Sequence, residues 1–229
     1  LSIGTAANTV VGLAYQRDLS GRRQHSPIFV GSEHFDDSVL FGATTAKAYV
    51  RGRLARFSYR RMKGLVCVNG RLADRFTNEY TGDTGVVTVI SNPCRLALAD
   101  ADLVVRKREK RREEGQPFNL VGIGGLSRRK NWAMALRAFA KVAGSTPMRL
   151  RVAGVGPELN ALRALSLELQ IDSRVEFVGH VSDVAGFLSE SDALIHAATS
   201  EAFGLVLVEA LSQGVPVIAT KTSGAVEIH

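Results

Sequence analysis

The sequence predicts an α/β protein built on parallel β-sheets, and two observations indicate this fold class. From Pro117 onward, short apolar runs of strand type alternate with longer segments of helical type. Strands that alternate with helices at this spacing form parallel sheets, because each helix carries the chain back to start the next strand in the same direction. A length of 229 residues with 45% apolar content is enough for one large domain or two small ones.

The elements of the second half follow from this alternation. We expect strands at residues 118–123, 150–153, 175–178, 193–196 and 215–218. We expect helices at residues 132–142, 158–169, 184–188 and from about 204 to 211.

The first half is less regular. We expect helices at residues 1–19, 46–63 and 71–79, and strands at residues 27–30, 64–68 and 85–90, with Asn69 as a helix cap. Residues 95–115 end in a run of charges that indicates either a linker or a solvated helix. The predicted organisation is an N-terminal domain at residues 1–92, a linker at 93–116 and a C-terminal domain at 117–229. The chain begins at Leu1 and stops at His229, so we expect a segment truncated at both ends.

Positive charge is concentrated in the first half of the chain. Residues 1–115 carry 19 Lys and Arg against 12 Asp and Glu, whereas residues 116–229 carry 10 of each. This asymmetry predicts an anionic partner for the first half, such as a lipid surface or a phosphorylated acceptor. Residues 47–63 alternate cations with apolar side chains, which is typical of a helix on an anionic membrane or of a helix with a basic solvated face.

Several function classes are disfavoured. The charged run near residue 110 interleaves acids with cations and has no aromatic residues, so nucleic acid is not an expected partner. Two cysteines, Cys67 and Cys94, form neither a disulfide framework nor a zinc site, which favours a reducing, cytoplasmic compartment. No apolar run reaches the roughly 18 residues that a membrane span needs.

The most informative stretch is residues 200–220, which contains Glu201 and Glu209. Gly204 precedes an apolar segment of helical type, residues 205–211, in which Glu209 is the only polar residue. In a helix, residues eight apart lie about 12 Å apart along the axis and about 80° apart around it. The two carboxylates therefore do not form a close catalytic pair. We expect Glu201 in the loop before the helix and Glu209 inside it.

The start of this predicted helix favours anions. Its first N–H groups, near Gly204, Leu205 and Val206, have no acceptor within the helix, and the positive end of the helix dipole lies at the same place. A carboxylate on each side of a phosphate site suits a diphosphate with hydroxyl-rich groups at both ends. The predicted ligand is therefore a nucleotide-sugar. The alternative is an ordinary helix with one exposed and one half-buried acid.

These residues resemble a known family. The spacing of Glu201 and Glu209, followed by Gly-Val-Pro-Val-Ile-Ala-Thr, is similar to the signature of the retaining GT-B glycosyltransferases of family 4, or glycosyl transferases group 1. The Ser-Gly-Ala-Val-Glu at residues 223–227 resembles the same family. The resemblance covers nearly the whole chain. It implies two Rossmann-like domains, an incomplete acceptor-side domain at residues 1–92 and a nucleotide-sugar-binding domain at residues 117–229.

A second segment extends the resemblance. Residues 124–131 read Gly-Gly-Leu-Ser-Arg-Arg-Lys-Asn and are similar to the family's Gly-Arg-Leu-Ser-x-x-Lys-Asn, in which the Arg and the Lys contact the donor diphosphate. Lys130 is retained, whereas Gly125 stands where the family has Arg. Either Arg128 or Arg129 supplies the missing charge, or the donor site is weakened. Taken alone, the glycines also suggest a dinucleotide loop, but the third glycine of that fingerprint is missing.

The resemblance implies roles for the candidate residues. Glu201 and His34 are the catalytic candidates at the transferring sugar, and Glu209 is expected to bind the ribose hydroxyls. His34 follows a predicted strand, and its alternative role is that of an ordinary loop histidine. The further donor-binding candidates are Lys130, Gly204, Leu205, Val206, Gly124, Arg129 and Val181.

The function that the resemblance implies is retaining transfer of a hexose from a nucleotide diphosphate sugar to a polysaccharide or lipid-linked glycan. It implies no metal and no other cofactor, and a cytoplasmic protein that is soluble or peripheral on the inner face of the plasma membrane. One alternative is a catalytically impaired nucleotide-sugar-binding or assembly subunit, suggested by Gly125. Another is a dehydrogenase-like protein, which would bind NAD more tightly than a nucleotide-sugar.

Overall fold

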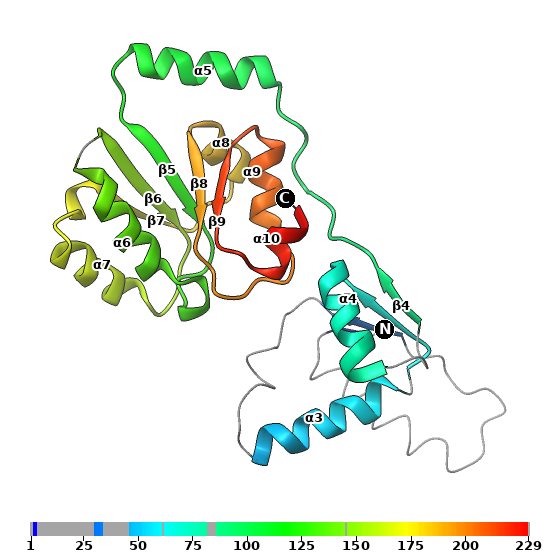
Figure 1. The fold of residues 1–229 in the computed structure, drawn as a ribbon. Coiled ribbons are helices and arrows are strands. Elements are labelled where there is room, and N and C mark those ends of the chain that lie inside the picture. Colours follow the sequence, from blue (N-terminus) through cyan, green and yellow to red (C-terminus); the bar gives the residue numbers. More distant parts are fainter. Residues whose placement is uncertain are drawn as a thin grey trace, which may run out of the picture. The chain divides into compact units, whose positions relative to one another are not determined.

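The computed structural model of the protein describes residues 2–3, 30–33, 46–60, 62–81, 86–144 and 146–228. Contacts between Cα atoms divide the chain into two compact units (Figure 1). The first unit contains Leu1–Asn92 together with Glu201–Phe203. The second unit contains Pro93–Ser200 together with Gly204–Ile228.

The first unit contains a parallel sheet in the order β1–β2–β3–β4. Its described strands are β1 (Ser2–Ile3), β2 (Val30–Glu33), β3 (Gly64–Cys67) and β4 (Val86–Val89). Its described helical segments are α3 (Ala46–Tyr59), α4 (Gly70–Phe76) and the π-helical turn η1 (Thr77–Thr81). The rings of Tyr59, Phe76 and Tyr80 join these helices, with centroids 5.1 to 5.5 Å apart. Aromatic contacts of this geometry stabilise a small core beyond the area they bury.

The sequence predicts part of this unit correctly. The strands expected at residues 64–68 and 85–90 are confirmed, and Asn69 caps α4 because its Oδ1 accepts from the N–H of Leu72 at 2.7 Å. The strand expected at 27–30 is observed at Val30–Glu33. The helix expected at 1–19 is wrong at its start, since residues 2–3 pair with β2 as a strand.

Two further predictions concern the first unit: the helix at residues 46–63 and the candidate residue His34. The helix predicted over residues 46–63 ends at Tyr59, where the chain turns into β3. His34 lies outside the described residues.

The second unit contains a five-stranded parallel sheet in the order β7–β6–β5–β8–β9. Its strands are β5 (Phe118–Ile123), β6 (Met148–Ala153), β7 (Val175–Gly179), β8 (Ala193–His196) and β9 (Val217–Ala219). Its helices are α5 (Ala101–Glu113), α6 (Trp132–Ala143), α7 (Leu159–Glu168), α8 (Val184–Ser189), α9 (Leu205–Ser212) and α10 (Ser223–Ile228), with the 3-10 turns η3 (Arg128–Lys130) and η4 (Asp172–Arg174). The predicted alternation of strands and helices is confirmed. The last strand starts two residues later than expected, because the N–H of Val215 still donates to Ala210 of α9.

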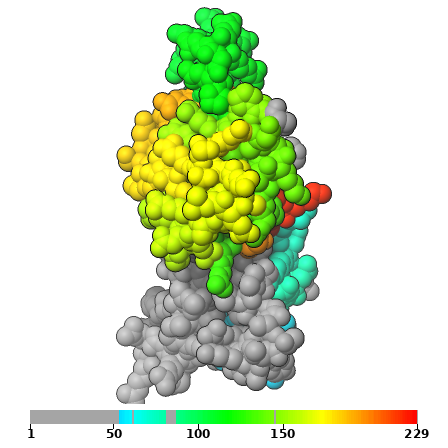
Figure 2. Space-filling model, turned by 90° about the vertical axis from the view of Figure 1, so that its left-hand side faces the viewer, coloured from blue at the N-terminus to red at the C-terminus, as the bar shows by residue number. Residues whose placement is uncertain are grey.

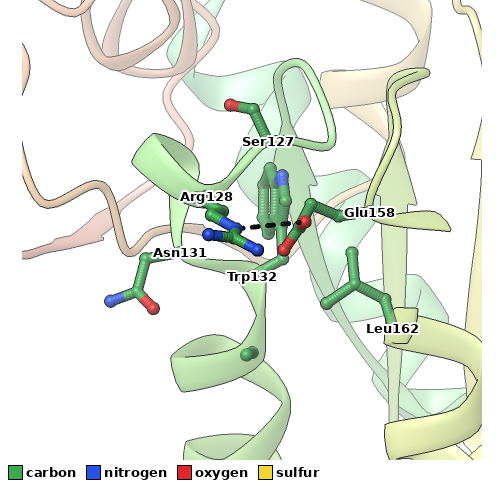
Figure 3. Close-up of a pocket in the computed structure, with 7 residues that line it drawn as sticks. Ser127, Arg128, Asn131, Trp132, Glu158 and Leu162 are labelled. Atoms are coloured by element: carbon green, nitrogen blue, oxygen red, sulfur yellow. Dashed lines mark ion pairs between the residues drawn. The ribbon is translucent and has the colours of Figure 1, made fainter.

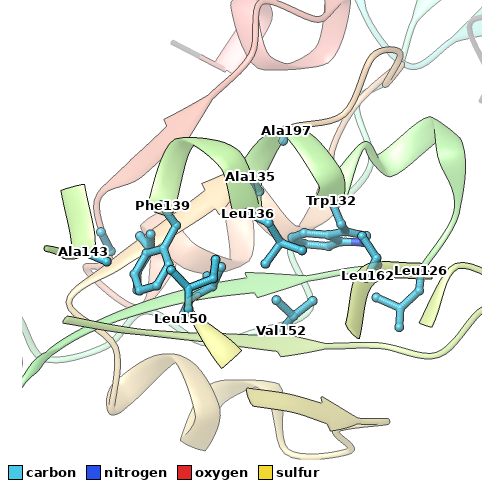
Figure 4. Close-up of a cluster of buried hydrophobic side chains, with 13 residues drawn as sticks. Leu126, Trp132, Ala135, Leu136, Phe139, Ala143, Leu150, Val152, Leu162 and Ala197 are labelled. Atoms are coloured by element: carbon cyan, nitrogen blue, oxygen red, sulfur yellow. The ribbon is translucent and has the colours of Figure 1, made fainter. Parts of the chain in front are cut away.

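Two apolar clusters cover opposite faces of this sheet. On one face, Trp132 and Phe139 of α6 pack with Leu150 of β6 (Figure 4). On the other face, Leu207 of α9 packs with Val121 of β5. Adjacent residues of a strand point to opposite faces, so one strand contributes side chains to both clusters. The sheet is therefore buried on both sides, as expected for parallel strands with helical connections.

Helix α5 lies in the region that the sequence assigns to a linker or a solvated helix. Asp100 caps it by accepting from the N–H of Leu103 at 3.1 Å. Val104 is its buried residue. Most of its other side chains are exposed, and Figure 2 shows the helix, in green, projecting from the second unit. Among the described residues, no helix is both long enough and apolar enough to cross a bilayer.

Candidate functional site

The order of strands in the second sheet identifies one place where ligands are expected. After β5 the chain passes through α6 to β6 on one side, whereas after β8 it passes through α9 to β9 on the other. The connections diverge at the carboxyl ends of two neighbouring strands, β5 and β8. Open parallel α/β sheets bind ligands at such a switch point, because the diverging helices leave a crevice there.

Glycines bring the loops at this edge of the sheet close together. The N–H of Gly124, after β5, donates to Ala153 at 2.9 Å, and the N–H of Gly154, after β6, donates to Gly179 at 2.7 Å. Gly154 has φ +147°, which L side chains rarely adopt, and a Cβ there would overlap the carbonyl oxygen of Gly124. These loops therefore present backbone, rather than side chains, to the carboxyl edge.

Lys130 is placed by the short turn that follows β5. Its N–H donates to the carbonyl of Ser127 at 3.0 Å, which closes η3, and Asn131 then adopts a left-handed conformation from which α6 starts. The aliphatic stem of Lys130 lies over Gly124, since a Cβ on that glycine would be 3.4 Å from Cε. The stem is thus packed and the half-exposed residue presents its ammonium group beside the glycine turn.

Hydrogen bonds join the loop after β5 to the loop after β8. The N–H of Thr199 donates to the carbonyl of Arg129 at 2.9 Å, and the Thr199 hydroxyl donates to the same oxygen at 3.2 Å. Nη1 of Arg129 donates to the carbonyl of Ser200 at 3.1 Å. The Arg129 guanidinium therefore lies beside the segment that leads into α9. The sequence did not reveal the role of Thr199, because a single loop threonine carries no pattern.

The amino end of α9 has the features that the sequence predicts for an anion site. Gly204 precedes the helix in a left-handed conformation, with φ +82°, and its carbonyl accepts from the N–H of Leu207 at 2.9 Å. Glycine supplies no side chain to cap the first N–H groups, which belong to Leu205 and Val206. Leu205 is exposed, whereas Gly204 and Val206 are buried.

Glu209 lies in the second half of α9 and is half-buried, as the sequence predicts for a residue inside the helix. Burial raises the pKa of its carboxyl group, and the positive charge of Arg95 partly opposes this shift. Burial disfavours the ionised form, so hydroxyl or cationic groups that approach this carboxylate lower its pKa. Arg95 was not singled out from the sequence, since it lies more than 100 residues away along the chain.

The remaining candidates occupy different surroundings. Val181 follows β7, and its side chain packs against the apolar cluster on the α9 face. Glu201 is half-buried in the short segment that groups with the first unit. There the side-chain amide of Asn69 donates to the carbonyl of Ala202, the neighbour of Glu201.

Arg128 points away from α9. Its Nε lies 3.8 Å from Oε1 of Glu158, which precedes α7, and the pair flanks a pocket of about 180 Å³ between η3 and α7 (Figure 3). The Arg128 side chain is 94% exposed. Of the two arginines that could supply the charge missing at position 125, Arg129 is therefore the one beside the switch point.

Gly125 itself is exposed and tolerates a side chain. Its φ lies outside the left-handed region, and a Cβ there would meet only the carbonyl oxygen of Val155, at an ordinary 3.7 Å. Its carbonyl accepts from the indole N–H of Trp132 at 3.1 Å, a bond that a substitution of the side chain leaves intact. Among the described residues, no group of three or more His, Cys, Asp or Glu could hold a metal ion.

A parallel α/β sheet whose glycine loops, cations and helix amino terminus meet at a switch point has the architecture of a nucleotide-binding protein. Residues 105–229 match the family model described as glycosyl transferases group 1, and the chain belongs to this family. The predicted α/β class with parallel sheets and GT-B type is confirmed by the fold and its structural neighbours.

Individual relatives share about a quarter to a third of their residues with the chain over the matched regions. The chain is 34% identical over 127 residues to N-acetyl-alpha-D-glucosaminyl L-malate synthase of Bacillus anthracis, covering 56% of this chain and 33% of that protein. It is 26% identical over 199 residues to the phosphatidylinositol N-acetylglucosaminyltransferase gpi3 subunit of Schizosaccharomyces pombe, covering 85% and 42%. The chain spans about half or less of the length of these relatives.

Among solved structures, the Anabaena protein Alr3699/HepE in complex with UDP is similar to the chain, with a TM-score of 0.73 and 21% identity. The match covers 98% of this chain and 60% of that one. At this identity the likeness establishes the fold.

Proposed function

We propose that the protein is a retaining glycosyltransferase that moves a hexose from a nucleotide diphosphate sugar to a hydroxyl acceptor. The observation that carries the proposal is the meeting of three features at one switch point: Lys130, the Arg129 guanidinium and the uncapped amino end of α9. Family membership and the UDP complex of a structural neighbour support the same ligand class.

The diphosphate is assigned to the cations and the helix amides. Negative charge grows on the leaving phosphate as the glycosidic bond breaks, and fixed donors aimed at that charge stabilise the transition state more than the ground state. Lys130 and Arg129 supply mobile positive charge, and the N–H groups of Leu205 and Val206 supply a fixed dipole. The glycine turn at Gly124 allows the phosphates to approach the backbone closely.

The two acids are assigned to the ends of the donor. Glu209 accepts hydrogen bonds from the ribose hydroxyls, and these bonds favour its ionised form over the neutral form that burial favours. Glu201 and His34 are both assigned to the transferring sugar. The leaving phosphate takes the acceptor's proton, which removes the need for a protein base. The backbone of Val181 lies against the base.

The proposed acceptor is a polysaccharide or a lipid-linked glycan, and the protein is proposed to be cytoplasmic and peripheral on the membrane. Helix α3 supports a lipid surface, because Leu54 and Phe57 are 40% and 38% exposed among the exposed cations Arg53, Arg56 and Arg60. Apolar side chains surrounded by cations are typical of helices that lie on anionic bilayers. The phosphatidylinositol named in a relative's description fits the same chemistry.

A second candidate function is that of a nucleotide-sugar-binding or assembly subunit with impaired catalysis. Gly125, in place of the expected arginine, favours this alternative, and one relative is described as a subunit.

Calorimetric titration with UDP, GDP and their sugars tests donor binding. Lys130→Met is expected to weaken binding about 10- to 100-fold, the range of a hydrogen bond to a charged group. The matched control is Lys141→Met, because Lys141 is an exposed lysine of α6 away from the switch point. Equal affinities for the two variants would contradict the assignment.

A transfer assay separates the two candidate functions. With the donor that binds most tightly, the product's anomeric configuration is read by NMR over the first turnovers. Retention of configuration supports the proposal, and inversion contradicts it. Tight binding with no transfer to any glycan or lipid acceptor supports the subunit alternative.

A further inference from the structure

A second pocket lies at the opposite, amino edge of the second sheet. Its volume is about 340 Å³. It lies between the end of α5, the starts of β5 and β8, and the turn that precedes β6. The polar and charged residues that line it are Arg111, Arg112, Gln116, Thr146 and Asp192. Because all strands of the sheet are parallel, this edge is a strand length away from the switch point.

Arginines dominate the charge of this pocket. Arg111 and Arg112 line it, and Asp192 is the acid among the lining residues. Nη2 of Arg111 lies 3.1 Å from Oδ2 of Asp192, and the same oxygen accepts from the N–H of Asn119 at 2.7 Å. The Asp192 carboxylate is therefore already shared between two donors. Nε of Arg111 is buried and has no hydrogen-bond acceptor in the described structure.

A third arginine adds to the positive charge. Arg108 donates to the carbonyl of Ser191 at 3.2 Å. Burial lowers the pKa of the Arg108 guanidinium, Asp192 raises it, and the neighbouring charges of Arg111 and Arg112 lower it further. The guanidinium groups of Arg108 and Arg111 thus both lie near the Asp192 carboxylate, and the positive charges of Arg108, Arg111 and Arg112 repel one another.

Nearby acids are held by other cations or amides. Glu114 accepts from the side-chain amide of Gln116 at 3.0 Å and lies 3.8 Å from the ammonium of Lys110. The carboxylate of Glu190 lies 3.4 Å from the guanidinium of Arg151. The arginine cluster therefore retains an excess of positive charge that an anion would neutralise.

We propose that this pocket binds a small anion that carries one or more phosphate groups. Guanidinium groups bind phosphate oxygens in a bidentate geometry, and a phosphate group offers several acceptor oxygens to more than one arginine. Thr146, which carries a hydroxyl group, lines the same pocket. This site accounts for part of the positive charge that the sequence concentrates before residue 116, and it is independent of the donor site.

Titration with inorganic pyrophosphate tests the proposal in the Lys130→Met background, in which binding at the donor site is weakened. In that background, we expect pyrophosphate to bind and to raise the melting temperature. Adding Arg112→Gln is expected to weaken binding about tenfold or more, the effect of losing a hydrogen bond to a charged group. Arg112 is exposed, so its replacement leaves the buried Arg111–Asp192 pair in place.

Arg106→Gln is the matched control, because Arg106 is an exposed arginine of α5 that does not line the pocket. It is expected to leave pyrophosphate affinity unchanged. Arginines in the last turn of a helix also stabilise the helix through its dipole. If that were the whole role of Arg112, Arg112→Gln would lower stability without changing pyrophosphate affinity, and the proposal would be overturned.

The phosphate group could belong to a soluble metabolite or to a lipid. Co-sedimentation with vesicles of phosphatidylcholine, with and without phosphatidic acid as the anionic lipid, distinguishes the two sources. Arg112-dependent binding of pyrophosphate alone identifies a soluble anion, and Arg112-dependent binding of vesicles identifies a lipid headgroup. Binding of neither ligand, or binding of both that is insensitive to Arg112→Gln, overturns the proposal.

Discussion

The two edges of the second sheet are built by different means. At the carboxyl edge, loops approach through glycines, and their backbones bond directly, as in the bond from Gly154 to Gly179. At the amino edge, side chains hold the elements together, as in the pair of Arg111 with Asp192. A site made of backbone presents N–H donors in fixed positions. This arrangement suits an extended ligand that forms hydrogen bonds at several points.

The same contrast indicates where stability resides. The amino edge contains a buried hydrogen-bond network: the Asn119 side chain donates to the carbonyl of Glu190 at 2.7 Å and accepts from Arg149 at 3.2 Å. The carboxyl edge instead contains glycines in conformations that other residues rarely adopt. Substitutions at the amino edge should therefore leave nucleotide binding unchanged, whereas substitutions at the carboxyl edge should change both stability and nucleotide binding.

The largest expected effect is that of Asp192→Ala. Its side chain is 6% exposed, that of Arg111 is 16% exposed, and removing one partner of a buried pair costs about 3–5 kcal/mol because the other charge stays buried. Chemical denaturation should show this loss, with UDP affinity unchanged at temperatures where the variant is folded. The control is Glu176→Ala, whose exposed pair with Arg151 should contribute less than about 1 kcal/mol.

Gly154→Ala comes next. The φ of +147° and the overlap of a Cβ with Gly124 should destabilise the protein by about 1–3 kcal/mol and separate the loops after β5 and β6. UDP affinity should therefore fall together with stability. Gly144→Ala is the control, since φ there is −70° and nothing lies within 4 Å of the added Cβ. If Gly154→Ala left UDP affinity unchanged, the prediction that substitutions at the carboxyl edge change nucleotide binding would be contradicted.

Glu209→Gln should give a smaller, pH-dependent effect. Because burial raises the folded-state pKa above the ordinary 4.5, the folded protein holds the proton more tightly than the unfolded chain, and stability declines as the pH rises from 4.5 through the raised value. Glutamine removes this decline, so thermal melts of the variant should show flatter stability across that interval. Nucleotide affinity should fall in the same variant, and an unchanged affinity would contradict the assignment of Glu209 to the ribose.

The smallest expected effect is that of Gly125→Arg. If Arg129 and Lys130 already supply the charge at the diphosphate, UDP affinity and transfer should change by less than about threefold, or 0.7 kcal/mol. Gly125→Gln controls for size without charge. A gain of tenfold or more in transfer would instead favour the impaired-subunit alternative.

Much of the fold follows from the sequence. The strands β5 and β8 and the helix α9 were predictable because each is an apolar segment of suitable length between turn residues. The start of β9 was misplaced because a backbone bond from Val215 to Ala210 extends the end of α9, and no side-chain pattern encodes that bond. The helix expected at the start of the chain was wrong at residues 2–3 because small apolar residues suit a strand as well as a helix.

The candidate site was predictable only in part. Lys130, Gly204 and Glu209 stand in recognisable patterns. The structure places Lys130 in η3 and Gly204 immediately before α9, and it places Glu209 inside α9, as expected. Two features were not predictable: the hydrogen bonds of Thr199 to Arg129, and the position of Arg129, rather than Arg128, beside the switch point. Both depend on which loop each side chain faces. That information comes from the order of strands in the sheet, which a linear pattern does not contain.

The most direct test of the central claim is a crystal structure of the protein with a bound nucleoside diphosphate. The account predicts the diphosphate at the carboxyl ends of β5 and β8, within hydrogen-bond distance of the Lys130 ammonium and of the Leu205 or Val206 N–H, with Glu209 on the ribose hydroxyls. A diphosphate bound elsewhere, with the amino end of α9 covered by protein, would contradict it.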